Sequence, residues 1–98
     1  MKTFKDLKPK NKVYVFHIQE LKVTECVVVS NDINIGCKLK FMYNNELIEI
    51  IVPKMYRVIS RGLLRIHSDI QSTKSELNSL MSMYKYSIEN AKTFINTH

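Results

Sequence analysis

The spacing of apolar residues changes near Ser68, and no other feature limits the fold of this chain so strongly. Across residues 36–43 apolar and polar side chains alternate, whereas from Leu77 onward apolar residues recur at steps of four and three. Alternation is typical of a strand with one buried face, and the second spacing is typical of an amphipathic helix. The sequence therefore predicts one domain, in which residues 1–67 form a small β-barrel and residues 68–98 a helix.

Four strands are expected in the first half of the chain, where β-branched and aromatic residues are dense. Asn44-Asn45 predicts a tight hairpin turn, because asparagine adopts positive φ more easily than most residues. Pro53 ends the fourth strand, since proline cannot donate a ladder hydrogen bond. The expected strands are residues 13–18, 21–30, 36–43 and 46–52.

The segment from Met55 to His67 has two interpretations. The first is a pair of short strands, residues 56–60 and 63–67, joined by Arg61-Gly62. The second is a helix, because Arg57, Arg61 and Arg65 are spaced by four. Glycine inside a helix costs about 1 kcal/mol relative to alanine, so we prefer the strands. In that case Arg57, Ile59 and Arg65 would share a face away from Val58, Leu64 and Ile66.

The C-terminal helix would begin with a capping box at Ser68–Gln71 or Thr73–Glu76. It would run for about 25 residues, or roughly 38 Å, whereas a barrel of this size is only roughly 20–25 Å across. Part of its apolar stripe would then extend beyond the barrel, and a second copy of the chain would cover it. Otherwise the helix lies obliquely across the sheet or frays after Ile88. The stripe contains Leu77, Met81, Tyr84, Ile88, Ala91 and Ile95.

Residues Leu7 to Val15 resemble the entry to the first strand of SH3-like small barrels, which often reads Leu-x-x-Gly-Asp-x-Val-hydrophobic-Val. Lys10 stands here in place of the glycine and Asn11 in place of the aspartate. The layout is also similar to small uncharacterised phage and mobile-element proteins, in which a helix opened by Ser-Asp follows such a barrel, as at Ser68-Asp69. The resemblance implies a mostly β, α+β fold: an SH3-like antiparallel β-barrel followed by one long amphipathic helix. It implies no site residue, because such barrels serve many functions.

Catalytic and metal-binding patterns are missing from the sequence. It contains no Gly-x-Ser-x-Gly, no His-Glu-x-x-His and, with two glycines, no phosphate loop. His17, His67, His98, Cys26 and Cys37 have no metal-ligand spacing. We expect His17 to pack between strands and both cysteines to be buried thiols. The expectation is a protein that is not an enzyme and has no cofactor and no metal.

Positive charge is concentrated in two segments of a chain whose net charge is +6. Residues 1–12 carry a net +4 and residues 53–67 another +4, whereas residues 13–52 carry −2 and residues 68–98 are neutral. If the two basic segments meet on one face, they would bind nucleic acid, with Tyr14, Tyr43 or Tyr56 stacking on bases. Alternatively they are solvated strand edges, where lysine discourages aggregation, or a product of AT-rich codons. The candidate contacts are Lys8, Lys10, Lys12, Lys54, Arg57, Arg61 and Arg65.

Three functions follow from these features. The first is a non-enzymatic interaction module, an accessory protein of a phage or mobile element that contacts a protein partner or itself. The second is a nucleic-acid-binding small barrel that uses the basic segments, and the third sequesters a nucleotide or another anion. The sequence contains neither a secretory signal nor an apolar run of about 18 residues, so we expect a cytoplasmic protein of a bacterial or phage-infected cell, with no membrane partner.

Overall fold

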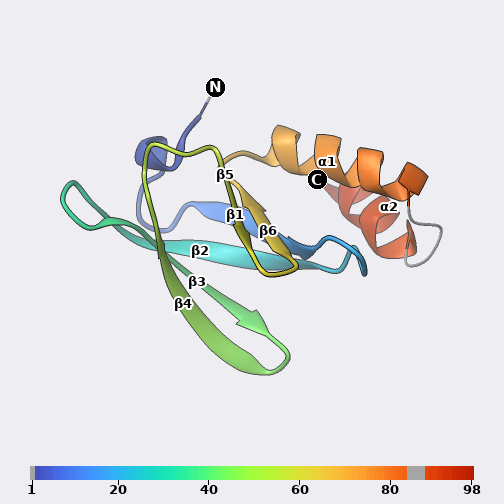
Figure 1. Ribbon diagram of the computed structural model, residues 1–98, viewed down its shortest axis with the longest axis horizontal. Coiled ribbons are helices and arrows are strands. Elements are labelled where there is room, and N and C mark those ends of the chain that lie inside the picture. The colour runs from blue at the N-terminus through green and yellow to red at the C-terminus, as the bar shows by residue number, and fades with distance from the viewer. Residues whose placement is uncertain (1, 84–87) are drawn as a thin grey trace.

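The computed structural model describes residues 2–83 and 88–98. Six strands form one antiparallel sheet in the order β4-β3-β2-β1-β6-β5, which curls into a half-barrel, and helices follow it (Figure 1). The predicted mostly β, α+β fold with an antiparallel sheet before C-terminal helices is confirmed. The elements are η1 (Phe4–Asp6), β1 (Lys12–His17), β2 (Val23–Asp32), β3 (Gly36–Tyr43), β4 (Glu46–Val52), β5 (Val58–Arg61), β6 (Leu64–His67), α1 (Ile70–Met83) and α2 (Ile88–Thr97).

The hairpin turns form where the sequence provides residues that tolerate positive φ. Asn44 and Asn45 have φ of 50° and 65° and join β3 to β4, as predicted. Gly36 begins β3 with a φ of 120°, and a Cβ there would lie 2.7 Å from the Val52 carbonyl oxygen. Only glycine therefore allows β3 and β4 to approach so closely at this end.

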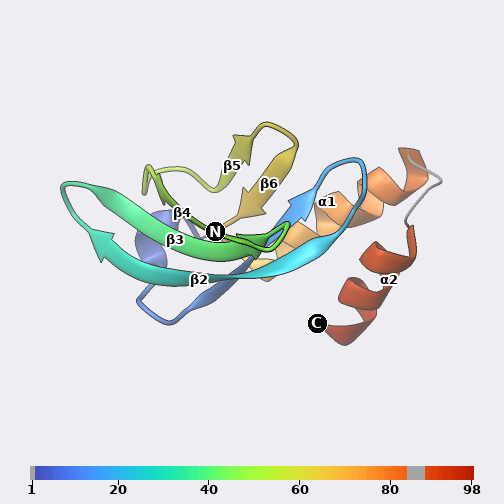
Figure 2. The ribbon, with the colours of Figure 1, turned by 90° about the horizontal axis from the view of Figure 1, so that it is seen from below.

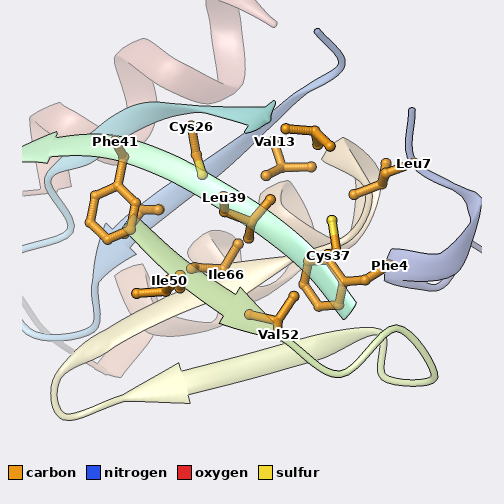
Figure 3. Packing of buried hydrophobic residues seen from close by; sticks show 12 residues of the cluster. Phe4, Leu7, Val13, Cys26, Cys37, Leu39, Phe41, Ile50, Val52 and Ile66 are labelled. Atoms are coloured by element: carbon orange, nitrogen blue, oxygen red, sulfur yellow. The ribbon is translucent and has the colours of Figure 1, made fainter. Parts of the chain in front are cut away.

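The concave face of the sheet encloses the first core, to which all strands and η1 contribute (Figure 3). Side chains that alternate along β3, such as Leu39 and Phe41, point into it. A register shift between Val28 and Ser30 marks a bulge in β2, which increases local bending of a strand. The buried members are Phe4, Leu7, Val13, Val15, Cys26, Val28, Cys37, Leu39, Phe41, Ile50, Val52 and Ile66.

The opposite face of the sheet carries the second core, which the two helices cover over β1, β2 and β6 (Figure 2). Its buried members are Phe16, Leu21, Leu77, Ala91 and Phe94. Strand β1 has both faces buried, because Val15 enters the first core and Phe16 the second. The sheet is thus the layer that joins the two cores.

The expectation of one long helix is wrong. Helix α1 ends at Met83, α2 begins at Ile88, and the two pack against each other in the second core. A straight rod would leave part of its apolar stripe in water, whereas two shorter helices bury both halves of the stripe against one sheet. The start also differs from both predicted capping boxes: Oδ1 of Asp69 accepts a hydrogen bond from the Ser72 N–H at 2.8 Å, so Asp69 caps α1.

The strand interpretation of residues 56–67 is confirmed, and Arg65 faces away from Leu64 and Ile66 as predicted. The faces predicted for Val58 and Ile59 are wrong, because the turn is shifted by one residue. The turn lies at Gly62-Leu63, so Ile59 pairs with Ile66 and Arg61 with Leu64. Ile59 therefore faces the first core, and Arg65, opposite Ser60, lies on the other face of the sheet. Side chains alternate along a strand, so a slip of one residue exchanges the two faces.

A candidate nucleic-acid interface

The two basic segments are joined by backbone hydrogen bonds, although they are far apart in the sequence. The Lys5 N–H donates to the Lys54 carbonyl at 2.8 Å, and the Phe4 N–H donates to the Tyr56 carbonyl at 2.9 Å. Figure 1 shows η1 beside the connection between β4 and β5. This pairing places the backbones of Lys5 and Lys54 next to each other, as the charge pattern would require of a shared anion-binding surface.

Ser68 links a second pair of basic residues from the same two segments. Its buried hydroxyl donates to the Lys2 carbonyl at 2.6 Å, and its backbone N–H donates to the Arg57 carbonyl at 2.8 Å. Four cationic residues are thus brought together by hydrogen bonds of their own backbone. We call this group the basic end; it consists of Lys2, Lys5, Lys54 and Arg57.

Asn31 of β2 anchors the N-terminal segment to the sheet. Its side-chain amide donates to the carbonyls of Phe4 at 2.8 Å, Lys5 at 3.2 Å and Leu7 at 2.8 Å. The side chains of Phe4 and Leu7 insert into the first core, so the backbone of this segment is held from both sides. Lys5 therefore projects from an ordered turn and not from a free tail.

The electrostatic balance of the basic end is strongly positive. Lys2, Lys5 and Arg57 are exposed and Lys54 is half-buried, and none of the ion pairs among the described residues involves the three lysines. The nearby carboxyl of Asp6 accepts the Thr3 N–H at 2.9 Å, and this backbone hydrogen bond lowers the pKa of Asp6. Asp69 is occupied in capping α1. Lys2, Lys5 and Arg57 thus face solvent and Lys54 does so in part, with two carboxylates nearby.

The seven residues predicted as anion contacts are not all brought together. Lys54 and Arg57 belong to the basic end, and Lys8 and Lys10 are exposed in the turn before β1. Lys12 pairs with Glu25 at 3.5 Å and Arg65 with Glu76 at 3.0 Å, so each of these cations already has a carboxylate partner.

Arg61 lies at the far end of β5 and lines a groove of about 380 Å³ that Glu49 also lines. Lys2 and Lys5 were missing from the predicted set. Thr3 and Asp6, spaced like the two ends of a capping box, are the signal that could have predicted an ordered turn around Lys5.

A pocket of about 600 Å³ lies between the start of β1 and the start of α1. Of the basic residues that the structure describes, only Lys2 and Lys12 line it, and the carboxylate of Asp69 lines it too. The basic residues do not converge on this pocket. This geometry gives no support to a buried nucleotide site, whereas an exposed cationic surface fits a polyanion.

The apolar stripe predicted for self-association lies largely inside the molecule. Leu77 and Ala91 are fully buried in the second core, and Met81 and Ile95 pack against it. Ile88 is half-buried at the start of α2, and Tyr84 lies outside the described residues. The stripe therefore covers the sheet of its own chain.

His17, Cys26 and Cys37 are buried inside the fold. Nδ1 of His17 accepts the backbone N–H groups of Gln19 and Glu20 at 3.2 and 3.0 Å, so this buried ring caps the turn after β1. Cys26 and Cys37 are free and buried in the first core, and burial raises the pKa of the Cys26 thiol to about 12. Within residues 2–83 and 88–98, no cluster of three or more histidine, cysteine, aspartate or glutamate residues could hold a metal ion.

Comparison of the chain with protein-family models, with curated proteins and with solved structures finds no match. Among the described residues, no helix has both the length and the apolar character needed to cross a membrane.

Proposed function

We propose that the protein is a non-enzymatic nucleic-acid-binding module and that the basic end is its contact surface. The observation that carries this proposal is the pairing of residues 4–5 with residues 54–56, which unites the two basic segments. Lysine and arginine contribute to nucleic-acid affinity by neutralising phosphates and releasing the counterions condensed on them. A cluster of exposed cations on an ordered backbone fits that role better than isolated surface lysines do.

A protein-binding role through the helical stripe has less support. The stripe is buried against the sheet, so a partner would need to bind another surface. An accessory role in a phage or mobile element remains a prediction from the resemblance. We also propose that the sheet is an open relative of the SH3-like barrel, supported by the pairing of β1 with β6, which curls the sheet around the first core.

The test is the binding of fluorescently labelled oligonucleotides, measured by anisotropy over a range of salt concentrations. We expect binding that weakens steeply with salt in the unmodified protein. A double variant, Lys5→Ala with Lys54→Ala, should lower the slope of log affinity against log salt by about 1.4 for a single strand. The matched control is Lys40→Ala with Lys92→Ala, which removes the same charge from exposed positions on β3 and α2.

Three outcomes would overturn the proposal. The first is the absence of oligonucleotide binding at low salt, and the second is an equal loss of affinity in the control variant. The third is salt-dependent binding to phosphatidylserine vesicles, requiring Lys5 and Lys54, without binding to oligonucleotides. That result would identify an anionic lipid surface as the partner, because lipid headgroups and nucleic acids share the same attraction for lysine.

A further inference from the structure

We infer that the basic end binds single strands in preference to duplexes, with the ring of Tyr56 stacking on a base; this inference rests on the proposed function. Tyr56 lies between Lys54 and Arg57 on the connection from β4 to β5. Half of its surface, 50%, is exposed, whereas Phe4, whose backbone is bonded to it, is completely buried. An aromatic residue is thus exposed among cations that would hold the phosphates.

The backbone around Tyr56 is well ordered. Its carbonyl accepts the Phe4 N–H at 2.9 Å, and its own N–H donates to the Pro53 carbonyl at 3.3 Å. A ring on a fixed backbone loses less conformational freedom on binding than one in a mobile loop. The exposure of Tyr56 therefore belongs to the folded state and leaves a ring available to a ligand.

The other two tyrosines considered for stacking are engaged elsewhere. The Tyr14 ring lies 4.8 Å from that of Phe94 and 5.0 Å from that of His98, measured between ring centroids. Tyr43 packs against the first core. Of the three, Tyr56 is the one that lies in the chain segment of the basic end and is exposed.

A ring in this position distinguishes single strands from duplexes. Bases inside a duplex are stacked on each other and paired, so a protein ring reaches them only after they are extruded. In a single strand each base can stack on the ring while its flanking phosphates contact the lysines. The combination of one half-exposed aromatic residue with flanking cations is the arrangement that sequence-tolerant single-strand binders use.

The experiment compares an oligothymidylate of about 12 nucleotides, within the usual site sizes, with a duplex of the same length. We expect the single strand to bind more tightly, and Tyr56→Ala to weaken its binding by about 5- to 150-fold. The salt slope should stay unchanged in Tyr56→Ala, because stacking releases no phosphate counterions, whereas Lys54→Ala should lower it by about 0.7. Tyr56→Phe should retain the affinity, since it keeps the ring.

The matched control is Met55→Ala, which truncates an adjacent side chain that is 74% exposed, and it should bind like the unmodified protein. Equal affinity for single strand and duplex, or unchanged affinity in Tyr56→Ala, would overturn the inference while leaving salt-dependent binding and the proposed function intact. Complete absence of nucleic-acid binding would overturn both. An unfolded Tyr56→Ala would be recognised by circular dichroism, and Tyr56→Trp, which should bind at least as tightly as the unmodified protein, would then decide the matter.

Discussion

At the scale of single residues, the side-chain amide of Asn31 decides where the N-terminal segment lies. Three carbonyls accept hydrogen bonds from its Nδ2. Asn31→Ala should lower the free energy of unfolding by about 1–3 kcal/mol, because three carbonyl acceptors, two of them in part-buried hydrogen bonds, lose their donor. Asn31→Asp should cost more, since a carboxylate facing three carbonyl oxygens repels them. Urea unfolding followed by circular dichroism measures both.

The control for this charge change is Asn34→Asp, three residues away in an exposed turn, which should change stability by less than about 0.5 kcal/mol. If Asn31→Asp were as stable as Asn34→Asp, the amide would not anchor the segment.

Hydrogen bonds between residues far apart in the chain could not be predicted from the sequence. Asn31 and Phe4 are 27 positions apart and Ser68 and Lys2 are 66 apart, whereas periodicity and turn signals are local.

The buried thiols make stability fall at alkaline pH. Burial raises the pKa of Cys26 to about 12, whereas a cysteine in the unfolded chain ionises near pH 8.5. Between these values the unfolded state holds fewer protons than the native state, so the free energy of unfolding decreases as pH rises. The contribution of Cys26 to the free energy of unfolding is complete below about pH 8.5. Above that pH it is lost at up to about 1.4 kcal/mol per pH unit.

Urea unfolding between about pH 8 and 10.5 tests this, because that range spans the ionisation of an unfolded thiol. Cys26→Ala should be less stable at neutral pH, since it leaves a cavity, but its stability should fall less steeply with pH. If the free energy of unfolding fell equally steeply with pH in Cys26→Ala and in the unmodified protein, the expected role of this thiol would be contradicted. The burial of Cys37 was predictable from its alternation with lysine in β3, and the burial of both cysteines from the general behaviour of free thiols.

At the scale of elements, one carboxylate fastens α1 to β6. Glu76 Oε1 lies 2.6 Å from His67 Nε2, and Oε2 lies 3.0 Å from Nη1 of Arg65. All three side chains are less than one-third exposed, so solvent screens these interactions only partly. Glu76→Gln should lower the free energy of unfolding by about 1–3 kcal/mol, because the Arg65 guanidinium loses its counter-charge in a half-buried site.

The matched control is Glu89→Gln in the exposed first turn of α2, where we expect a change below about 0.5 kcal/mol in the same urea unfolding experiment. Equal effects at the two positions would mean that the cluster contributes nothing to docking. The role of Arg65 could not be predicted from the sequence, because its partner Glu76 lies on a separate element, α1. Strand existence was predictable from residue type, whereas the face of each side chain depended on the position of the turn.

At the scale of the whole molecule, the sequence indicated which side chains are apolar but not what covers them. A helix that overhangs the sheet requires residues 68–98 to form one straight rod. The two observed helices lie on the sheet instead, and Phe16, Leu77 and Phe94 meet there from three separate elements. The division into a sheet part and a helical part was predictable, because periodicity is set by the backbone of each element.

Because β1 contributes to both cores, the molecule should unfold as a single unit, as domains of this size usually do. Leu39→Ala in the first core and Phe94→Ala in the second should each lower the free energy of unfolding by about 2–5 kcal/mol. Two probes separate the cores in the same urea titration: loss of helical circular dichroism reports the second, and exposure of Cys26 and Cys37 to a thiol reagent reports the first. The two curves should coincide in the unmodified protein and in both variants. Helices that melt in Phe94→Ala while the thiols remain protected would instead show that the half-barrel folds independently and that the helices are an addition to it.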